Sequence, residues 1–530
     1  MSVFLHFPGT SDRKFVLAWL VGIVFVAAAF VALVRARQSR GLCFQTEGGC
    51  SFDRRSCIER SIAQGGIEMS VPEYDLVVIG SGPAGQKGAI AAAKARKRVA
   101  LIDRAVMMGG VSVHTGTIPS KTLREAIFQL TGLAVKALYG NTSQKRPNIS
   151  VQDLSSRVNG IITRETEVVR AQLTRNGVAI YEGTARFAHS HTVEIRGDGE
   201  GIRVKGENIL IACGTRPAHS PDIPFDNHRI VDTDHLSCLG GIPKDIIVVG
   251  AGVIGLEYAS FMAALGSEVT LIDQRPAILE FVDREIVEAL LYHLRQLGGT
   301  LRLGEKVTQL GIDAKRDFVF VALESGKRVH GDALIYAVGR QANSDQLHLE
   351  AAGLVADLRG KLKVNEFFQT DILHIYAAGD VIGFPALAST SMEQGRLAAN
   401  HMFGIPFDHM PELFPYGIYT IPEISMVGPT EETLTSNRVP YEVGIARYSE
   451  LAKSMMLGDE TGMLKLLFDP ETRKLLGVHA LGQRATEIIH IGQAVLFYRG
   501  SVEYFRDMVF NYPTLAEAYK VAALDGLNKL

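Results

Sequence analysis

The chain has 530 residues, enough for about three domains of ordinary size. Its 55 basic and 57 acidic side chains give a formal net charge of −2, and no basic patch or aromatic stripe indicates nucleic acid, so we expect no such partner. Only two of its five cysteines, Cys213 and Cys238, lie beyond residue 70, which is typical of a reducing compartment. No set of side chains has the spacing of a metal site, so we expect no metal.

The N-terminal extension, residues 1–70, contains an apolar segment of membrane-spanning length. Residues 15–34 carry no charge and are followed by several arginines, an arrangement that would anchor the chain in a membrane with its main body in the cytoplasm. A signal peptide fits less well, because export would separate the chain from cytoplasmic nucleotides. In a third interpretation, translation starts at Met69, immediately before the first predicted strand. We favour this third interpretation and a cytoplasmic location.

The first element after the extension is a nucleotide-binding motif. Residues 75–79 form an apolar run short enough for a buried strand, and an alanine-rich helix follows a glycine-rich turn. A second strand, residues 99–102, ends at Asp103. This order predicts a dinucleotide site, in which the turn approaches a pyrophosphate and Asp103 accepts hydrogen bonds from a ribose. The glycines of the turn are Gly80, Gly82 and Gly85.

The same pattern recurs further along the chain. A strand at residues 246–249 leads into a second glycine-rich turn, a helix and a strand that ends at Asp273. Two such units predict two dinucleotides, one a permanently held flavin and the other a nicotinamide nucleotide that binds and leaves. Asp273 favours NAD, whereas Arg275 is placed to pair with the 2′-phosphate of NADP. The glycines of this turn are Gly250, Gly252 and Gly255.

Four further segments resemble signatures of the class I pyridine nucleotide-disulfide oxidoreductase family. They are residues 109–121, 209–217, 375–380 and 510–519. The resemblance covers the chain from residue 71 onward. It implies that the first motif binds FAD and the second binds NAD(H) or NADP(H). It also implies an α/β fold with two doubly wound, Rossmann-like domains and a C-terminal α+β domain that makes a homodimer or a higher homo-oligomer.

The resemblance also assigns domains and site residues. Lys121 is expected beside the flavin with Glu257 as its ion-pair partner, and these two are the candidate catalytic residues. Asp380 is expected to bind the ribityl chain. The other cofactor contacts are expected from Arg104, Gly110, Ser112, Ala185, Gly214 and Gly339. The expected domains are residues 71–220 for FAD, 221–345 for NAD(P), 346–412 for a return to the FAD domain, and 413–530 for dimerisation.

The chain departs from the family at its thiol chemistry. Ser112 and Thr117 stand where the family has two redox-active cysteines, and neither hydroxyl can cycle between thiolate and disulfide. Tyr512 precedes Pro513 where the family has its acid/base histidine, although the partner acid, Glu517, is retained. One changed function explains both losses better than independent drift.

Within the family the chain most resembles the Si-specific transhydrogenases, which already carry threonine at the second cysteine position. Ser112 departs even from that pattern. The resemblance implies hydride exchange between NADPH and NAD⁺ through FAD, with both nucleotides using one site in turn. The alternatives are an NADH-selective diaphorase, a membrane-associated NADH:quinone reductase and a flavin-bearing redox sensor with little turnover.

Overall fold

The computed structural model describes residues 71–530 except 132–150, 198–200, 314 and 407–408. The chain divides into two compact units, residues 1–70 and 71–530, and all described residues belong to the second. The predicted apolar segment 15–34 and the predicted start at Met69 therefore lie outside the described residues. Within the described part, none of the helices combines the length and the apolar character that crossing a membrane would require.

The first nucleotide motif lies in a sheet with strand order β3-β2-β1-β6-β5-β4, and β17 also pairs with β6. The strands β1, β2, β3, β6 and β17 are parallel, whereas β4 and β5 form an antiparallel excursion with β6. Their bounds are β1 Glu73–Ile79, β2 Val99–Asp103, β3 Ala179–Glu182, β4 Thr184–His189, β5 Thr192–Arg196, β6 Ile202–Ile211 and β17 Ile375–Ala377.

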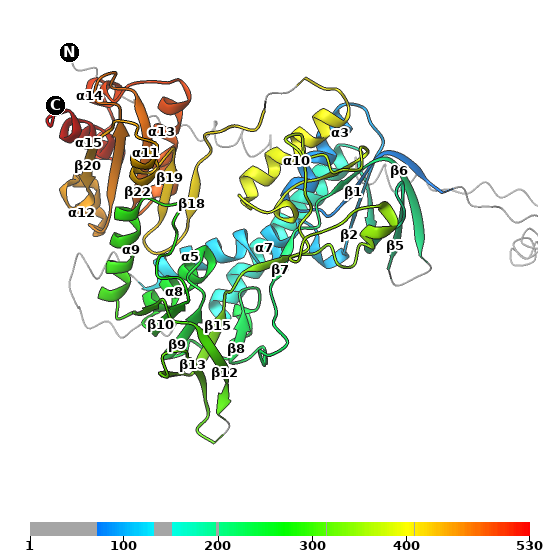
Figure 1. The fold of residues 1–530 in the computed structure, drawn as a ribbon, viewed down its shortest axis with the longest axis horizontal. Coiled ribbons are helices and arrows are strands. Elements are labelled where there is room, and N and C mark those ends of the chain that lie inside the picture. Colours follow the sequence, from blue (N-terminus) through cyan, green and yellow to red (C-terminus); the bar gives the residue numbers. More distant parts are fainter. Residues whose placement is uncertain (1–70, 132–150, 198–200, 314, 407–408) are drawn as a thin grey trace, which may run out of the picture. The chain divides into compact units, whose positions relative to one another are not determined.

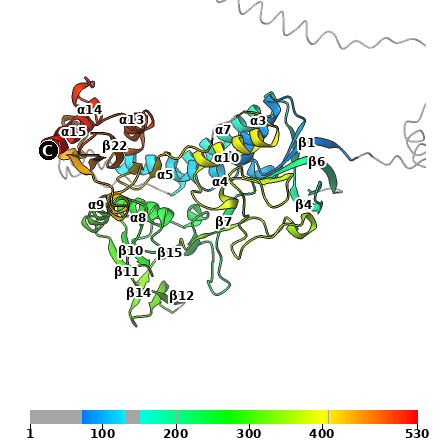
Figure 2. The ribbon, with the colours of Figure 1, turned by 45° about the horizontal axis from the view of Figure 1, so that its top comes forward.

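Both faces of this sheet are covered, which explains why β1 is apolar at consecutive positions. Leu76 and Val78 belong to one hydrophobic core, and Val77 and Ile79 belong to another. This is the pattern of a doubly wound sheet, since successive side chains of a strand point to opposite faces. The helices α3 (Pro83–Lys94) and α10 (Ala388–Met402) lie side by side in Figures 1 and 2.

Three other helices of this region follow β2. They are the short helix α4 (Val111–His114), then α5 (Thr117–Thr131) and α7 (Val151–Arg175). Helices α4 and α5 carry the segment with Ser112 and Thr117, the positions at which the family has cysteines, and α5 contacts α7 and α8 (Val253–Leu265).

The second nucleotide motif lies in a parallel sheet of order β11-β10-β9-β15-β8. Alternate residues of β9 again belong to two cores, one with Ile246 and Val248 and the other with Ile247 and Val249. The elements are β8 Ile230–Asp232, β9 Asp245–Val249, α8 Val253–Leu265, β10 Glu268–Asp273, α9 Arg284–Gln296, β11 Thr300–Leu303 and β15 Ala333–Tyr336.

Two smaller sheets accompany the parallel one. An antiparallel sheet joins β12 (Val307–Asp313), β13 (Phe318–Leu323) and β14 (Arg328–Gly331). A two-stranded antiparallel ribbon pairs β7 (Thr215–Pro217) with β16 (Arg340–Ala342). These two strands are the chain segments that lead into and out of the second sheet.

The C-terminal part is an antiparallel sheet of order β18-β19-β22-β21-β20 with helices, drawn in orange and red in Figure 1. Its elements are β18 Tyr416–Ile418, β19 Ile424–Val427, α11 Glu431–Ser436, β20 Glu442–Arg447, α12 Ala452–Leu457, β21 Met463–Phe468, β22 Leu475–Leu481, α13 Ala485–Phe497, α14 Glu503–Asp507 and α15 Glu517–Leu527. The predicted α/β fold class with two doubly wound sheets is confirmed. The domain boundaries within residues 71–530 stay predictions.

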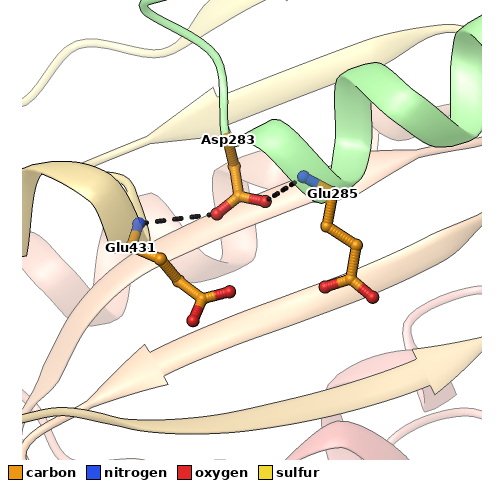
Figure 3. Close-up of side chains that lie close together, drawn as sticks. All are labelled: Asp283, Glu285 and Glu431. Carbon is orange, nitrogen blue, oxygen red and sulfur yellow. Dashed lines mark hydrogen bonds between the residues drawn. The ribbon is translucent and has the colours of Figure 1, made fainter. Parts of the chain in front are cut away.

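An ion cluster centred on the buried pair Lys465 and Asp283 joins helix α9, which follows β10 of the second sheet, to the C-terminal part. The carboxylates of Asp283, Glu285 and Glu431 lie within 4.8 Å of one another (Figure 3). The fully buried ammonium of Lys465 on β21 contacts all three, at 2.9 Å from Asp283 Oδ1 and 3.0 Å from Glu285 Oε2. Burial alone would lower the pKa of Lys465, but these carboxylates raise it above its ordinary value. The acidic group is therefore compensated by the chain's own cation.

Candidate active site

The first of two neighbouring cavities has a volume of about 340 Å³ and opens at the glycine-rich turn that follows β1. Most residues expected to contact FAD line it, although they come from segments far apart in the sequence. They are Gly80, Gly82, Asp103, Arg104, Gly110, Ser112, Ala185, Gly214 and Asp380. The carboxyl ends of parallel strands in a doubly wound sheet are where such ligands bind.

The three glycines of the first turn serve different purposes. A Cβ atom on Gly80 would lie 2.3 Å from Ala212 O, and one on Gly85 would lie 1.9 Å from Gly80 O, so the chain's own packing excludes side chains there. A Cβ atom on Gly82 would meet no atom within 4 Å and would project into open space. Because no described residue of the chain requires Gly82 to be bare, the space at Gly82 suits a closely approaching ligand such as a dinucleotide.

Asp103 makes a bond that the sequence analysis missed. Its carboxylate accepts hydrogen bonds from the Ser81 amide at 2.6 Å and from the Arg104 amide at 2.7 Å. The second motif repeats the arrangement, since Asp273 accepts from the Ala251 amide at 2.6 Å. Each acid therefore fixes the turn of its own motif. The expected contact of Asp103 with a ribose stays a prediction.

The second motif also repeats the pattern of glycines. A Cβ atom on Gly250 would lie 2.6 Å from Ala337 O and one on Gly255 would lie 1.9 Å from Gly250 O, whereas Gly252 again faces open space. Gly339 has a φ of 84°, a backbone conformation that favours glycine. None of these four glycines is among the residues that line either of the two cavities described here.

Arg275 lies directly against Asp273. Its Nε and Nη2 atoms are 3.0 and 2.7 Å from the two carboxylate oxygens. Burial alone would raise the pKa of Asp273, but hydrogen bonds from Arg275 and from the Ala251 amide hold it below its ordinary value. The Arg275 side chain is 51% exposed, so its guanidinium is accessible to a bound nucleotide.

A second cavity, of about 680 Å³, adjoins the first. Val111, Thr117 and Asp380 line both cavities, so the two spaces meet at the start of α5. The candidate catalytic pair, Lys121 and Glu257, lies in the second cavity.

The structure brings Lys121 and Glu257 together across 136 residues of sequence. Lys121 Nζ donates to both carboxylate oxygens at 2.8 Å, and Glu257 is almost fully buried. The Glu257 carboxylate also accepts from the Tyr419 amide at 2.9 Å, and Lys121 Nζ lies 4.8 Å from the centre of the Tyr419 ring. The ammonium is thus held at one place on the cavity wall by charge, hydrogen bonds and an aromatic face.

The positions of the two family cysteines carry no thiol chemistry. Ser112 Oγ donates to Gly109 O at 3.0 Å, and Ser112 and Thr117 both line the first cavity. Cys213 also lines that cavity, and burial raises the pKa of its thiol to about 12, so it is protonated at neutral pH. Neither Ser112 nor Thr117 can cycle between thiolate and disulfide, and the Cys213 thiol is not in its reactive thiolate form.

The C-terminal acid/base pair is also absent as a unit. The Tyr512 side chain is 71% exposed. The buried Oε2 atom of Glu517 accepts no hydrogen bond within the described part of the chain. Tyr512 and Glu517 therefore do not form the coupled pair that the thiol chemistry of the family requires.

Comparison with known proteins places this site in a family. The family model "Pyridine nucleotide-disulphide oxidoreductase" matches residues 74–395, and the dimerisation-domain model of the same family matches residues 414–523. The chain belongs to the pyridine nucleotide-disulphide oxidoreductase family.

Two relatives with the same name are similar to this chain over most of its length. The "soluble pyridine nucleotide transhydrogenase" of Mycobacterium bovis is 53% identical over 460 residues, which are 86% of this chain and 98% of the relative. The protein of that name from Sodalis glossinidius is 45% identical over 464 residues, covering 86% of this chain and 99% of its own length.

Two solved structures share the fold. LpdA from Mycobacterium tuberculosis matches with a TM-score of 0.78 at 25% identity, over 86% of this chain and 99% of its own. The HOCl-induced flavoprotein disulfide reductase RclA from Escherichia coli matches with a TM-score of 0.76 at 27% identity, over 85% and 99%. The predicted family, and the prediction of an oxidoreductase that uses FAD and nicotinamide dinucleotides, are confirmed.

The open space at Gly82 gives a test of the first cavity. Gly82→Ala should fold with an unchanged melting temperature, because its Cβ meets no protein atom and its φ of −62° suits alanine. Its affinity for FAD should fall about tenfold or more, because the methyl group enters the space of the ligand. Titration of apoprotein with FAD, followed by flavin fluorescence, measures this.

Gly252→Ala is the matched control, since it adds the same methyl group to the other motif and should leave the FAD affinity unchanged. An FAD affinity of Gly82→Ala equal to that of the unaltered chain would contradict the assignment.

Proposed function

We propose that this chain is an NAD(P)⁺ transhydrogenase that exchanges hydride between NADPH and NAD⁺ without a redox-active disulfide. One observation carries the proposal. The first cavity and the second cavity, which contains Lys121, share a wall at Thr117. The residues at the two family cysteine positions, Ser112 and Thr117, offer only hydroxyl groups. The high identity to proteins named soluble pyridine nucleotide transhydrogenase supports the same reaction.

In this proposal the Gly80–Gly85 turn, Asp103 and Asp380 would hold FAD along the first cavity, and bound FAD would supply the chemistry of hydride transfer to and from a nicotinamide. The chain's own residues orient the nucleotides and keep the reacting groups in place. Lys121, fixed by Glu257, places a positive charge on the wall of the second cavity, one helical turn beyond Thr117. Because that point is partly shielded from water, the charge stabilises electron density that develops beside it.

The second nucleotide site has to accept both NADPH and NAD⁺. We propose that the Asp273–Arg275 pair meets this need. Asp273 accepts hydrogen bonds from the ribose hydroxyls of NAD, and Arg275 leaves Asp273 to pair with the 2′-phosphate of NADP. The half-exposed guanidinium of Arg275 gives it the freedom to exchange partners.

We further propose a homodimer in the cytoplasm. The dimerisation-domain match supports the dimer, as do the exposed apolar side chains of Phe497, Tyr498, Val509 and Tyr512 in that part of the chain. Cytoplasmic nucleotides and the small number of cysteines in residues 71–530 support the location. The membrane-anchored alternative depends on residues 15–34.

Exchange between two nicotinamide nucleotides tests the reaction. Protein that starts at Met69 should reduce thio-NAD⁺ with NADPH in the absence of any disulfide. Double-reciprocal plots should be parallel, because both nucleotides use one site in turn. Lys121→Met should keep its FAD and slow the exchange about tenfold or more, since a fixed charge is removed from the site. Oxidation of NADH by dyes or quinones, with no exchange, would instead favour a diaphorase or quinone reductase.

Arg275→Ala tests the proposed selectivity. It should raise KM for NADPH about tenfold, because a charge-assisted pair with the 2′-phosphate is lost, and should leave KM for NADH nearly unchanged. Steady-state assays with each nucleotide measure the difference. Arg284→Ala, which removes an exposed arginine on α9, is the control. Equal changes for both nucleotides in Arg275→Ala would show that Arg275 does not distinguish them.

A further inference from the structure

A chain of hydrogen bonds runs along the wall of the second cavity. Arg340 lies at its centre and donates from Nε to Thr215 Oγ1 at 2.8 Å, from Nη2 to Thr215 O at 3.0 Å and from Nη1 to Asp234 Oδ1 at 3.1 Å. Thr215 Oγ1 donates to Asp380 Oδ2 at 3.3 Å, and Thr115 Oγ1 donates to Asp234 Oδ2 at 3.0 Å. All five residues line the cavity that contains Lys121.

The five residues come from parts of the fold that are separate in sequence. Thr115 directly follows α4, between Ser112 and Thr117, and Asp380 begins the turn after β17. Thr215 and Arg340 lie on the β7–β16 ribbon. Asp234 follows β8 of the second parallel sheet, which carries the second nucleotide motif and is called the nucleotide sheet below. The chain of bonds therefore connects the FAD side of the site to the nucleotide sheet through a single guanidinium.

The bonds are partly shielded from solvent, so they are stronger than equivalent bonds on an open surface. The side chains of Arg340 and Asp234 are 21% and 13% exposed. A guanidinium suits this position because its planar, rigid fork donates in several directions at once, which the point charge of a lysine does not. Burial raises the pKa of Asp380, and the nearby Arg340 cation opposes that rise.

We propose that Arg340 and Asp234 are positioning residues for hydride transfer, which hold the Thr115 turn and Asp380 in register with each other across the site. This inference rests on the proposed transhydrogenase function. The Asp234 link fixes the α4–α5 segment, which carries Thr117 and Lys121, relative to the nucleotide sheet. The Thr215 link fixes Asp380, the residue expected to bind the ribityl chain of FAD. Misalignment of reacting groups by a fraction of an ångström slows a reaction without preventing binding.

Two variants test the link from Thr115 to Asp234. Thr115→Val and Asp234→Asn break or weaken the link between the segment and the nucleotide sheet. They should lower the limiting rate of flavin reduction by NADPH about tenfold, while the apparent Kd for NADPH and the FAD content stay the same. Stopped-flow absorbance over a range of NADPH concentrations separates the limiting rate from Kd.

Arg340 should affect both sides of the site. Arg340→Met should lower the limiting rate and also weaken FAD binding to the apoprotein about tenfold, because Asp380 loses its support and its nearby cation. Arg340→Lys should recover FAD binding, since a cation remains, but should not recover the limiting rate. A purely structural role would not separate these two measurements.

His219→Phe is the matched control. His219 is half-exposed and lines neither cavity, and the phenylalanine ring cannot make the 2.6 Å bond to Asp232, which lies two residues from Asp234. This variant should leave the limiting rate unchanged. An unchanged rate in both Thr115→Val and Asp234→Asn, or an equal fall in His219→Phe, would overturn the proposal. Failure of the proposed function is distinguishable, because the unaltered chain would then show no exchange between NADPH and thio-NAD⁺.

Discussion

The candidate active site depends on the wall that the two cavities share. Val111, Thr117 and Asp380 line both spaces, so a ligand in one cavity and a ligand in the other meet at the start of α5. In a disulfide reductase of this family, the segment at this wall would carry electrons away from the flavin. Here that segment offers a serine and a threonine. Because neither hydroxyl can accept electrons as a disulfide does, the proposed exchange has electrons enter and leave on the nicotinamide side, with one nicotinamide cavity for both half-reactions.

The position of this wall follows from bonds between distant segments. The Lys121–Glu257 pair ties α5 to α8, and the Asp234–Arg340–Thr215 links tie the same region to the nucleotide sheet and to Asp380. The buried Lys465 cluster joins α9 to the C-terminal part in a similar way. Removal of one partner from such a buried ion pair is far more costly than its presence is stabilising. These bonds therefore constrain the relative position of the segments that they join.

Much of the fold and part of the site follow from local sequence. The strand, glycine turn, helix and acid of each motif lie within about thirty residues of one another, so their pattern alone predicts two nucleotide-binding sheets. The residues Gly82 and Asp103 were predictable for the same reason. The Asp380 and Lys121 assignments needed a family resemblance, because neither stands in a motif with a purely local meaning.

Sequence patterns could not predict the side-chain contacts between distant segments. Arg340 contacts Asp234 across 106 residues and Thr215 across 125, and no spacing rule connects such positions. From the sequence alone, Asp273 favours NAD and Arg275 favours NADP. The structure instead joins the two side chains in one ion pair. Because Arg275 is bonded to Asp273, selection between the two nucleotides depends on what makes Arg275 leave Asp273.

Within the described part of residues 71–530 the flavin should be the only redox centre, and a count of electrons in protein that starts at Met69 tests this most directly. Anaerobic titration of the FAD-loaded protein with dithionite, followed by flavin absorbance, gives the reducing equivalents taken up per FAD. The account predicts two electrons per FAD and no long-wavelength thiolate–flavin band at any point. Uptake of four electrons, or appearance of that band, would show a second, sulfur-based centre and would contradict the account.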